Sequence, residues 1–313
     1  MRLVFFGTPV FAVPALRSIV AHGHEVAAVV TQPPRVQGRG QSAEVPSPVM
    51  VEARKFNLPI LTPASARDPE FLAYIHALAP DASIVAAYGG ILPESLLSMP
   101  TRGTWNIHPS LLPRWRGPSP VQRTIWAGDT EAGVCIMQVV MEVDAGPVAL
   151  AERTSVGPRE TKFELEGRLA YFGADLLVSA LEHLGKGSLS TSPQDPAQST
   201  YAGMFKPEEM EIKWHRMAAE IDRLTRALAP APGAFFMLDG VRVKVRGVVP
   251  VSHPAEALPG TLVERIPGGA CRVACGSGSV WIGTALPQGK PWMSMDAFLQ
   301  GRRLKVGDKL VQS

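Results

Sequence analysis

The chain has 313 residues, a formal net charge of +3, 46% hydrophobic residues and 19% charged residues. This composition predicts a soluble globular protein, and no apolar run approaches the ~18 residues of a membrane-spanning helix. The length allows two domains of the usual ~100–200 residues each.

The cysteines argue against a disulfide framework or a metal site. There are three, Cys135, Cys271 and Cys275, an odd number that fits a reducing compartment. Cys271 and Cys275 lie close together, but no nearby His or Cys completes a zinc pattern. We therefore expect small buried residues and no metal. No signal peptide precedes the first apolar run, so we expect a cytoplasmic protein.

The first thirty residues predict a strand–helix–strand unit. Residues 1–6 form an apolar run that ends at Gly7-Thr8-Pro9, a helix is expected over 11–22, and 25–30 is a second apolar run. Such a unit implies an α/β fold with an open parallel sheet. The Gly7 turn has neither G-x-G-x-x-G nor a P-loop Gly-Lys-Ser/Thr, which excludes NAD and ATP as ligands there.

Residues 32–48 are rich in proline and glycine, and we expect a loop without regular structure. The loop carries Arg35 and Arg39. It is either a solvated connection or a mobile arm that contacts phosphates.

The pattern continues with helices over 51–56 and 69–78 and short strands over 59–61 and 83–87. A loop at 88–93 follows the last of these strands. Ligands of open α/β sheets bind beyond the carboxyl ends of the strands, where this loop should lie. The residue types alone favour a place in the core for Ile91 and Leu92.

An amide and an imidazole stand two positions apart at Asn106 and His108. In an extended segment both side chains point to the same side. Asn106 can donate to a developing oxyanion, and His108 can move a proton near neutral pH. Pro109 and Pro113 then exclude a regular helix. Spacing alone leaves two interpretations open, a catalytic pair or a structural His beside a capping Asn.

Beyond this stretch we expect a strand over 133–140, a turn over 142–146 and a long amphipathic helix over 164–184. Taken by itself, Asp144 is a typical turn residue. Residues 185–198 have the composition of a linker.

The C-terminal part predicts a helix over 217–228 and then a small β-barrel of short strands, at 241–245, 260–263, 271–274 and 279–282. Residues 1–206 carry 17 basic and 18 acidic side chains, whereas 207–313 carry 14 and 10. Arg242, Lys244 and Arg246 alternate along one strand and share a face. This face is either simply solvated or a surface for nucleic acid.

The run from Asn106 to Gly117 resembles the signature of the folate-dependent formyltransferases. Its continuation through Gln122 is similar to the methionyl-tRNA formyltransferases within that family. The resemblance extends over essentially the whole chain, including Phe5–Pro9, Ala87–Pro93 and Asp144–Gly146.

The resemblance implies a Rossmann-like formyltransferase domain over 1–189, a linker over 190–206 and an OB-like barrel over 207–313. It implies catalytic roles for Asn106, His108 and Asp144, with Asp144 holding His108. The implied folate site consists of Tyr88, Gly89, Ile91, Leu92, Pro93, Ser110, Leu111, Leu112 and Pro113.

The resemblance also implies a basic arm at 32–48 that approaches the tRNA acceptor stem. Gly38-Arg39-Gly40 fits that pattern, whereas Gln41 and Ser42 stand where lysines are usual in the family. The implied tRNA contacts are Arg35, Arg39, Arg242, Lys244 and Arg246.

The implied activity is transfer of the formyl group of 10-formyltetrahydrofolate to the amino group of methionyl initiator tRNA, by a monomeric enzyme without a metal. One alternative is a formyltransferase for another amine, such as a nucleotide sugar or glycinamide ribonucleotide. The other is a non-catalytic nucleic-acid-binding module. The basic C-terminal part and the 38–40 arm argue against the first, and the intact Asn106, His108 and Asp144 argue against the second.

Overall fold

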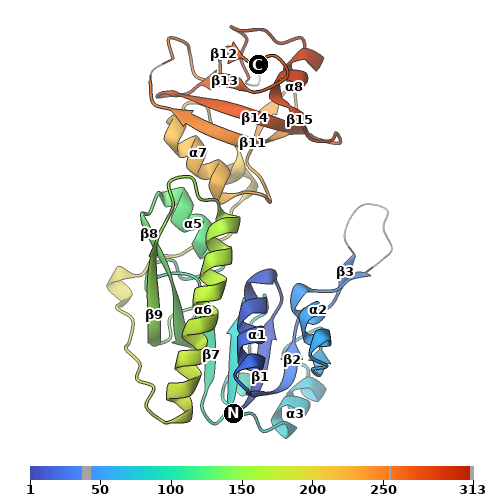
Figure 1. The fold of residues 1–313 in the computed structure, drawn as a ribbon, viewed down its shortest axis with the longest axis vertical. Helices are drawn as coiled ribbons and strands as arrows, with labels where there is room; N and C mark the ends of the chain where they lie inside the picture. The colour runs from blue at the N-terminus through green and yellow to red at the C-terminus, as the bar shows by residue number, and fades with distance from the viewer. Residues whose placement is uncertain (37–43, 254, 311–313) are drawn as a thin grey trace. The chain divides into compact units, whose positions relative to one another are not determined.

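A computed structural model describes residues 1–36, 44–253 and 255–310 (Figure 1). The chain forms two compact units. The first consists of Met1–Pro120, Glu131–Ser155 and Glu166–Ala202, and the second of Val121–Thr130, Val156–Leu165 and Gly203–Ser313. Much of the segment predicted as a linker is thus grouped with the first unit. The domain boundaries at 189 and 206 remain a prediction.

The first unit is built on a seven-stranded sheet of order β5-β2-β1-β6-β7-β8-β9. The strands from β5 to β7 are parallel, which confirms the open parallel sheet, and β8 and β9 add antiparallel pairs at one edge. The strands are β1 (Arg2–Gly7), β2 (Glu25–Val30), β5 (Ile60–Leu61), β6 (Ala82–Ala86), β7 (Thr104–His108), β8 (Glu131–Gln138) and β9 (Val148–Ser155).

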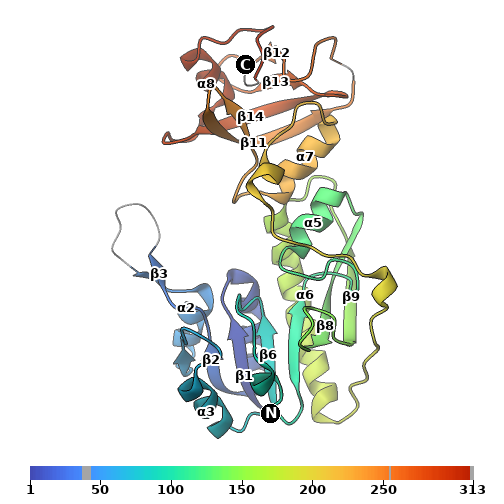
Figure 2. The same cartoon turned by 180° about the vertical axis from the view of Figure 1, so that it is seen from behind.

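Helices cover this sheet because their apolar faces pack on it. α3 and α4 contribute Phe71, Ile75 and Leu96 to a buried cluster with Val4 and Phe6 of β1. Along the chain lie the short 3-10 helix η1 (Val10–Ala12) and the helices α1 (Val13–Ala21), α2 (Pro48–Lys55), α3 (Pro69–Ala77), α4 (Glu94–Leu97), α5 (Pro120–Ala127) and α6 (Lys162–Gly185) (Figure 2). Apart from Pro120, α5 is grouped with the second unit, as is the start of α6 up to Leu165.

Helix α6 covers one face of strand β7, so only the opposite face can carry functional side chains. A Cβ on Gly173 of α6 would lie 2.6 Å from Ile107 and 3.1 Å from Val134, so the helix rests directly on these two side chains. Because side chains alternate along a strand, Asn106 and His108 point away from the α6 face.

The structure corrects the prediction that residues 32–48 contain no element. The two-stranded ladder of β3 (Arg35–Val36) and β4 (Glu44–Val45) lies within them, and α2 begins at Pro48. Ser47 caps α2, since its hydroxyl accepts the Met50 N–H at 3.0 Å. The sequence analysis also overlooked α5, β9 and the helix α8 (Met295–Gly301).

The second unit contains an antiparallel sheet of order β10-β11-β14-β13-β12, with β15 paired to β14. This agrees with the small barrel expected from the short strands. The strands are β10 (Phe235–Leu238), β11 (Val241–Val251), β12 (Leu262–Arg265), β13 (Cys271–Ala274), β14 (Ser279–Pro287) and β15 (Met293–Ser294). The other elements are η2 (Pro196–Gln198), which belongs to the first unit, η3 (Pro207–Met210), α7 (Ala218–Ala227) and α8 (Met295–Gly301).

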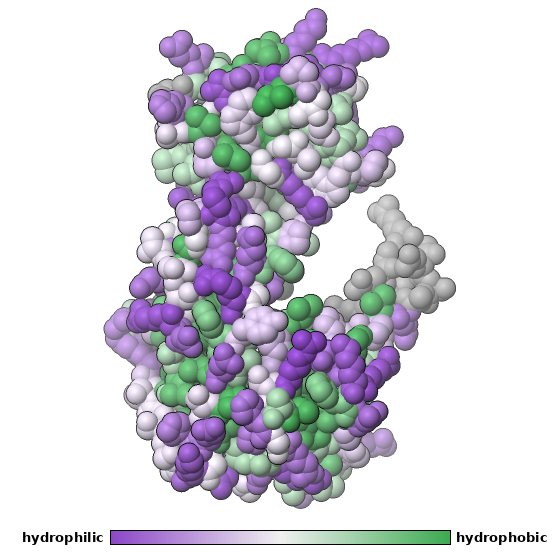
Figure 3. Space-filling model, in the orientation of Figure 1, coloured by the Kyte–Doolittle hydropathy of each residue, from purple (hydrophilic) through white to green (hydrophobic). Residues whose placement is uncertain are grey.

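Figure 3 shows hydrophilic and hydrophobic residues interspersed over the drawn face of the first unit. Within residues 1–36, 44–253 and 255–310, no helix is long and apolar enough to cross a membrane.

Candidate active site

The candidate site lies at the carboxyl ends of the parallel strands. Strand order reverses between β1 and β6, and such a reversal opens a crevice in α/β sheets. A cavity of about 340 Å³ occupies this position, within the ~300–1,000 Å³ typical of small-ligand sites. Its lining comes from the chain after β1, β2 and β6 and from the start of α2, namely Thr8, Pro9, Gln32, Pro33, Val45, Pro46, Ser47, Pro48, Ala87, Tyr88 and Gly89.

Asn106 and His108 lie on β7, next to β6 in the sheet. The backbone of β7 pairs with β8, with Asn106 opposite Met137 and His108 opposite Cys135. Alternation directs both side chains to the same face, as the spacing predicted. They therefore lie on an extended segment, as the sequence analysis assumed, and Pro109 follows directly after the strand.

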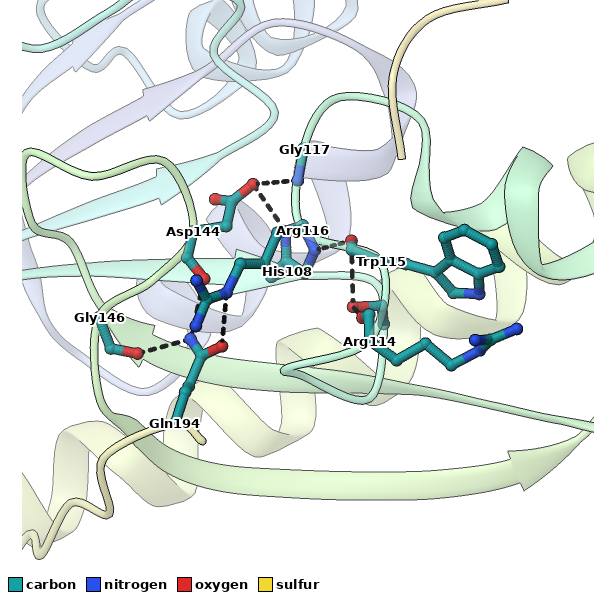
Figure 4. Close-up of polar contacts among 9 residues, drawn as sticks. His108, Arg114, Trp115, Arg116, Gly117, Asp144, Gly146 and Gln194 are labelled. Atoms are coloured by element: carbon teal, nitrogen blue, oxygen red, sulfur yellow. Dashed lines mark hydrogen bonds and ion pairs between the residues drawn. The ribbon is translucent and has the colours of Figure 1, made fainter. Parts of the chain in front are cut away.

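Both nitrogens of the His108 imidazole face a partner, and only 4% of the residue is exposed. Nε2 lies 2.9 Å from the carbonyl oxygen of Trp115 (Figure 4). A carbonyl only accepts, so Nε2 carries the proton of this hydrogen bond. Nδ1 faces the Asp144 carboxylate at 3.7 Å and is the nitrogen free to gain or lose a proton.

Asp144 comes from the turn after β8 and is itself held in place. Its carboxylate accepts the Gly117 N–H at 2.8 Å. The Asp144 side chain is 18% exposed, which leaves the carboxylate partly open to solvent. The sequence motif at 106–117 and the distant Asp144 thus meet in one site.

Three non-glycine residues around the site have left-handed backbone conformations. The φ angles are +48° at Ala87, +64° at Trp115 and +50° at Asp144. Such conformations persist where the surroundings enforce them, and they concentrate at functional sites. Trp115, with its left-handed conformation, is the residue whose carbonyl accepts the hydrogen bond from His108.

The loop after β7 is ordered by its own contacts. The Ser110 hydroxyl donates to the Arg114 carbonyl at 2.7 Å. A Cβ on Gly133 would lie 2.3 Å from the Leu111 side chain, so Leu111 packs on that glycine. The Leu112–Pro113 peptide bond is cis.

The residues expected to bind folate do not all line the 340 Å³ cavity. Tyr88 and Gly89 do, and Thr8 donates its hydroxyl to the Tyr88 carbonyl at 2.8 Å. Leu92 belongs to the core, in line with its residue type, whereas Ile91 is 76% exposed and the expectation of a core position was wrong. Pro93 precedes α4 as its N-cap residue.

Neither Cys135 nor Tyr88 supplies an ionised group to the site. Burial raises the pKa of the Cys135 thiol, which lies opposite His108, to about 11. Burial also raises the pKa of the Tyr88 hydroxyl. Both side chains are therefore neutral near pH 7.

The basic residues of the C-terminal unit lie on one strand face, as alternation predicted. Arg242, Lys244 and Arg246 alternate with the buried Val243 and Val245 along β11. The guanidinium of Arg242 stacks over Phe235, and that of Arg246 over Trp292, at 4.4 and 4.1 Å from the ring centroids. Arg35 lies in β3, and Arg39 falls outside the described residues.

The sequence analysis missed three further residues that contact the site. Arg116 is buried, Gln194 contacts the Asp144 turn, and Thr200 contacts Trp115. Arg116 lay within the signature without an assigned role, while Gln194 and Thr200 lay in the presumed linker. Across the part of the chain that the structure describes, no group of three His, Cys, Asp or Glu side chains could hold a metal ion.

Comparison with known proteins identifies the class. A family model described as formyl transferase matches residues 1–181, and one for the formyl transferase C-terminal domain matches 204–303. Methionyl-tRNA formyltransferase of Roseobacter denitrificans is 45% identical over 309 residues, 98% of each chain. The enzyme of that name from Parvibaculum lavamentivorans is 43% identical over 314 residues, 99% of this chain and 100% of that one.

The chain therefore belongs to the formyl transferase family, and within it to the methionyl-tRNA formyltransferases. This confirms the resemblance seen in the sequence. Solved structures with the same fold include HypX from Aquifex aeolicus in complex with tetrahydrofolic acid, with a TM-score of 0.67, 18% identity and coverage of 96% of this chain and 47% of that chain. A sugar N-formyltransferase from Shewanella has a TM-score of 0.61 and 18% identity, over 79% of this chain and 96% of that chain.

Proposed function

We propose that the chain transfers the formyl group of 10-formyltetrahydrofolate to the α-amino group of methionyl initiator tRNA, with Asn106, His108 and Asp144 as its catalytic residues. The family and the activity named for its relatives support the reaction. The observation that carries the assignment is the buried His108, with Nε2 bonded to Trp115 and Nδ1 facing Asp144 at 3.7 Å.

In this reaction the amine nitrogen attacks the formyl carbon, and a tetrahedral oxyanion forms. The bond between the formyl carbon and the folate nitrogen then breaks, and that nitrogen receives a proton while the amine loses one. Asn106 donates its amide hydrogen to the oxyanion, an interaction worth about 3–4 kcal/mol in comparable sites.

His108 moves the proton. Nδ1 accepts it from the attacking amine and returns it to the leaving nitrogen. The Asp144 carboxylate favours the imidazolium that forms, and the Gly117 N–H keeps the carboxylate beside the ring. The Trp115 carbonyl fixes the ring by accepting from Nε2 in both protonation states.

We assign the folate to the loops after β6 and β7. The predicted contacts are Tyr88, Gly89, Ile91, Leu92, Pro93, Ser110, Leu111, Leu112 and Pro113. A flat heterocycle with several donors and acceptors needs apolar walls and backbone partners, which these loops supply. The cavity beside Tyr88 and Gly89 supports a small-molecule site at this edge.

We assign the tRNA to basic groups that hold phosphates. Arg242, Lys244 and Arg246 on β11 present positive charge from a regular strand, and Arg35 and Arg39 belong to the predicted arm. Contacts of this kind position a nucleic acid without reading its sequence.

Formyl transfer from 10-formyltetrahydrofolate to methionine-charged initiator tRNA tests the proposal. We expect transfer with the natural chain, loss of activity in His108→Ala, and natural activity in His76→Ala, a matched change at an exposed position of α3. Transfer that persists in His108→Ala would overturn the catalytic role of His108.

The alternatives lead to different outcomes. Absence of transfer to tRNA, together with transfer to a nucleotide sugar or glycinamide ribonucleotide, would overturn the assignment of the acceptor. Binding of tRNA without turnover on any acceptor would indicate a non-catalytic module.

We also propose that the enzyme acts as a monomer in the cytoplasm. The three cysteines are free and buried, as expected for a protein from a reducing compartment. Light scattering on the purified chain should give the mass of one 33.6 kDa copy; a mass of two copies would contradict the monomer.

A further inference from the structure

The segment that follows α6 is bound to both loops of the active site. Ser192 and Val148 exchange two backbone hydrogen bonds of 2.9 Å at the end of the Asp144 turn. Farther along, Tyr201 pairs with Arg116 in the loop after β7. Residues 192–202, which lie within the predicted linker over 190–206, are therefore fixed at both ends to the two loops that carry the proposed catalytic groups.

The second attachment holds Trp115, whose carbonyl accepts the hydrogen bond from His108. The Thr200 hydroxyl accepts the Trp115 N–H at 2.9 Å, and the Thr200 carbonyl accepts the Arg116 N–H at 2.9 Å. These bonds hold Trp115 in its left-handed conformation, in which its carbonyl meets His108.

Two residues after the first attachment, the amide group of Gln194 bonds the Asp144 turn (Figure 4). Its nitrogen donates one hydrogen to the Asp144 carbonyl at 2.8 Å and one to the Gly146 carbonyl at 2.7 Å. Its oxygen accepts from Nε of the buried Arg116 at 3.0 Å. Both donors and the acceptor of this side chain are thus used between the two catalytic loops.

These bonds bear on the Asp144 carboxylate. Asp144 has a φ of +50°, a strained conformation that its surroundings must enforce. The turn is also tight, since a Cβ on Gly146 would lie 1.8 Å from the Gln138 carbonyl oxygen. Without Gln194, two turn carbonyls lose a shared donor, and the Asp144 backbone is free to relax away from His108.

We propose that Gln194 is a positioning residue for formyl transfer, which acts by holding the Asp144 turn in the conformation that keeps the carboxylate beside His108. The proposal rests on the proposed function of Asp144 and His108. It makes Gln194 part of the active site, although the residue lies in a segment predicted as a linker between domains.

The test compares Gln194→Met with Gln198→Met. Methionine keeps the length of the side chain and removes its hydrogen bonds, and Gln198 is an exposed residue of the same segment that bonds Asp195. We expect kcat to fall roughly 10- to 100-fold in Gln194→Met, with KM for folate and tRNA nearly unchanged. Gln198→Met should retain natural kcat. If Gln194→Met does not fold, Gln194→Asn, which is too short to bridge the same groups, takes its place.

A double-mutant comparison separates positioning from general stability. In an Asp144→Asn background we expect Gln194→Met to lower kcat less than twofold further, because the group it positions is already absent. An equal fall in both backgrounds would overturn the proposal. So would natural kcat in Gln194→Met while Asp144→Asn is impaired, which would leave the proposed function intact.

A second readout does not depend on activity. In nitrogen-labelled protein, the His108 ring signals, assigned with His108→Ala, should move in Gln194→Met and stay in place in Gln198→Met. Unchanged His108 signals in Gln194→Met would overturn the proposal. The natural chain could also fail to transfer a formyl group while the His108 signals still move in Gln194→Met. That result would reject the proposed function and keep the link from Gln194 to His108.

Discussion

The two regions assigned to the substrates are built in opposite ways. The catalytic edge depends on a buried imidazole, a tightly bonded turn and residues with left-handed backbones. The basic face of β11 is a regular strand with cations directed outward. A reacting group must be positioned within fractions of an ångström, whereas a phosphate contact requires mainly a charge within reach. We therefore expect small changes of shape to affect the first region and changes of charge to affect the second.

The largest effect should follow removal of a donor at the reacting atoms. We expect Asn106→Ala to lower kcat roughly 100- to 1,000-fold, because an oxyanion would lose a preorganised amide. Single-turnover rates at saturating folate and tRNA measure this, with thermal unfolding as the check on folding. A fall below tenfold would remove Asn106 from the catalytic residues.

A change of shape alone, without loss of a reacting group, should also lower the activity of the catalytic edge. Gly117 has a φ of +106°, and an added Cβ would lie 2.7 Å from the Tyr201 ring. Gly117→Ala should displace the N–H that binds Asp144 and lower kcat roughly 10- to 100-fold. Gly187→Ala is the matched control, since Gly187 has a φ of +67° and no heavy atom within 4 Å of an added Cβ. Equal kcat values in the two variants would show that shape at Gly117 is unimportant.

A change of charge on β11 should affect the binding of tRNA and leave the catalytic edge unaffected. We expect Arg246→Gln to raise KM for tRNA at low salt, to reduce the slope of log KM against log salt by about one, and to spare KM for folate. Arg67→Gln, which removes a cation from the first unit, is the control. Equal changes in both Michaelis constants would contradict a phosphate contact at Arg246.

The smallest effect concerns an ion pair outside both regions. Hydrogen bonds from Arg17 and Lys55 lower the pKa of the buried Glu52 carboxyl from 4.5 to about 2. A carboxyl with a depressed pKa stabilises the fold above its ordinary pKa, and this contribution is lost as the pH falls from about 4.5 to about 2.

We therefore expect Glu52→Gln to lower the free energy of unfolding at pH 7 by about 1–2 kcal/mol, a modest value because both cations are half-exposed. The difference from the natural chain should shrink at acid pH, and kcat should stay natural. Urea unfolding at pH 7 and pH 3 measures this, with the exposed Glu182→Gln as control. A difference that does not depend on pH would refute the ionic origin.

Local patterns predicted most of the elements. The apolar runs at β1, β2 and β6 and the long periodic helix α6 carry their signal in adjacent residues. The strand β9 was missed because its apolar start, Val148–Ala151, is short and gives way to the polar residues Glu152–Ser155, so neither a full apolar run nor alternation marks the strand. Ile91 was misplaced because its hydrophobicity says nothing about whether neighbouring chain covers it.

The sequence by itself determined the parallel α/β architecture, the shared side of Asn106 and His108, and the alternation of cations on β11, because all three follow from spacing along one segment. Only the tertiary structure decided that Trp115 accepts from His108, that Asp144 is held by Gly117, and that Gln194 bonds the Asp144 turn. These contacts join residues that lie 7, 27 and 50 positions apart along the chain. Their partners are chosen by how the chain packs, and packing leaves no periodic signal in the sequence.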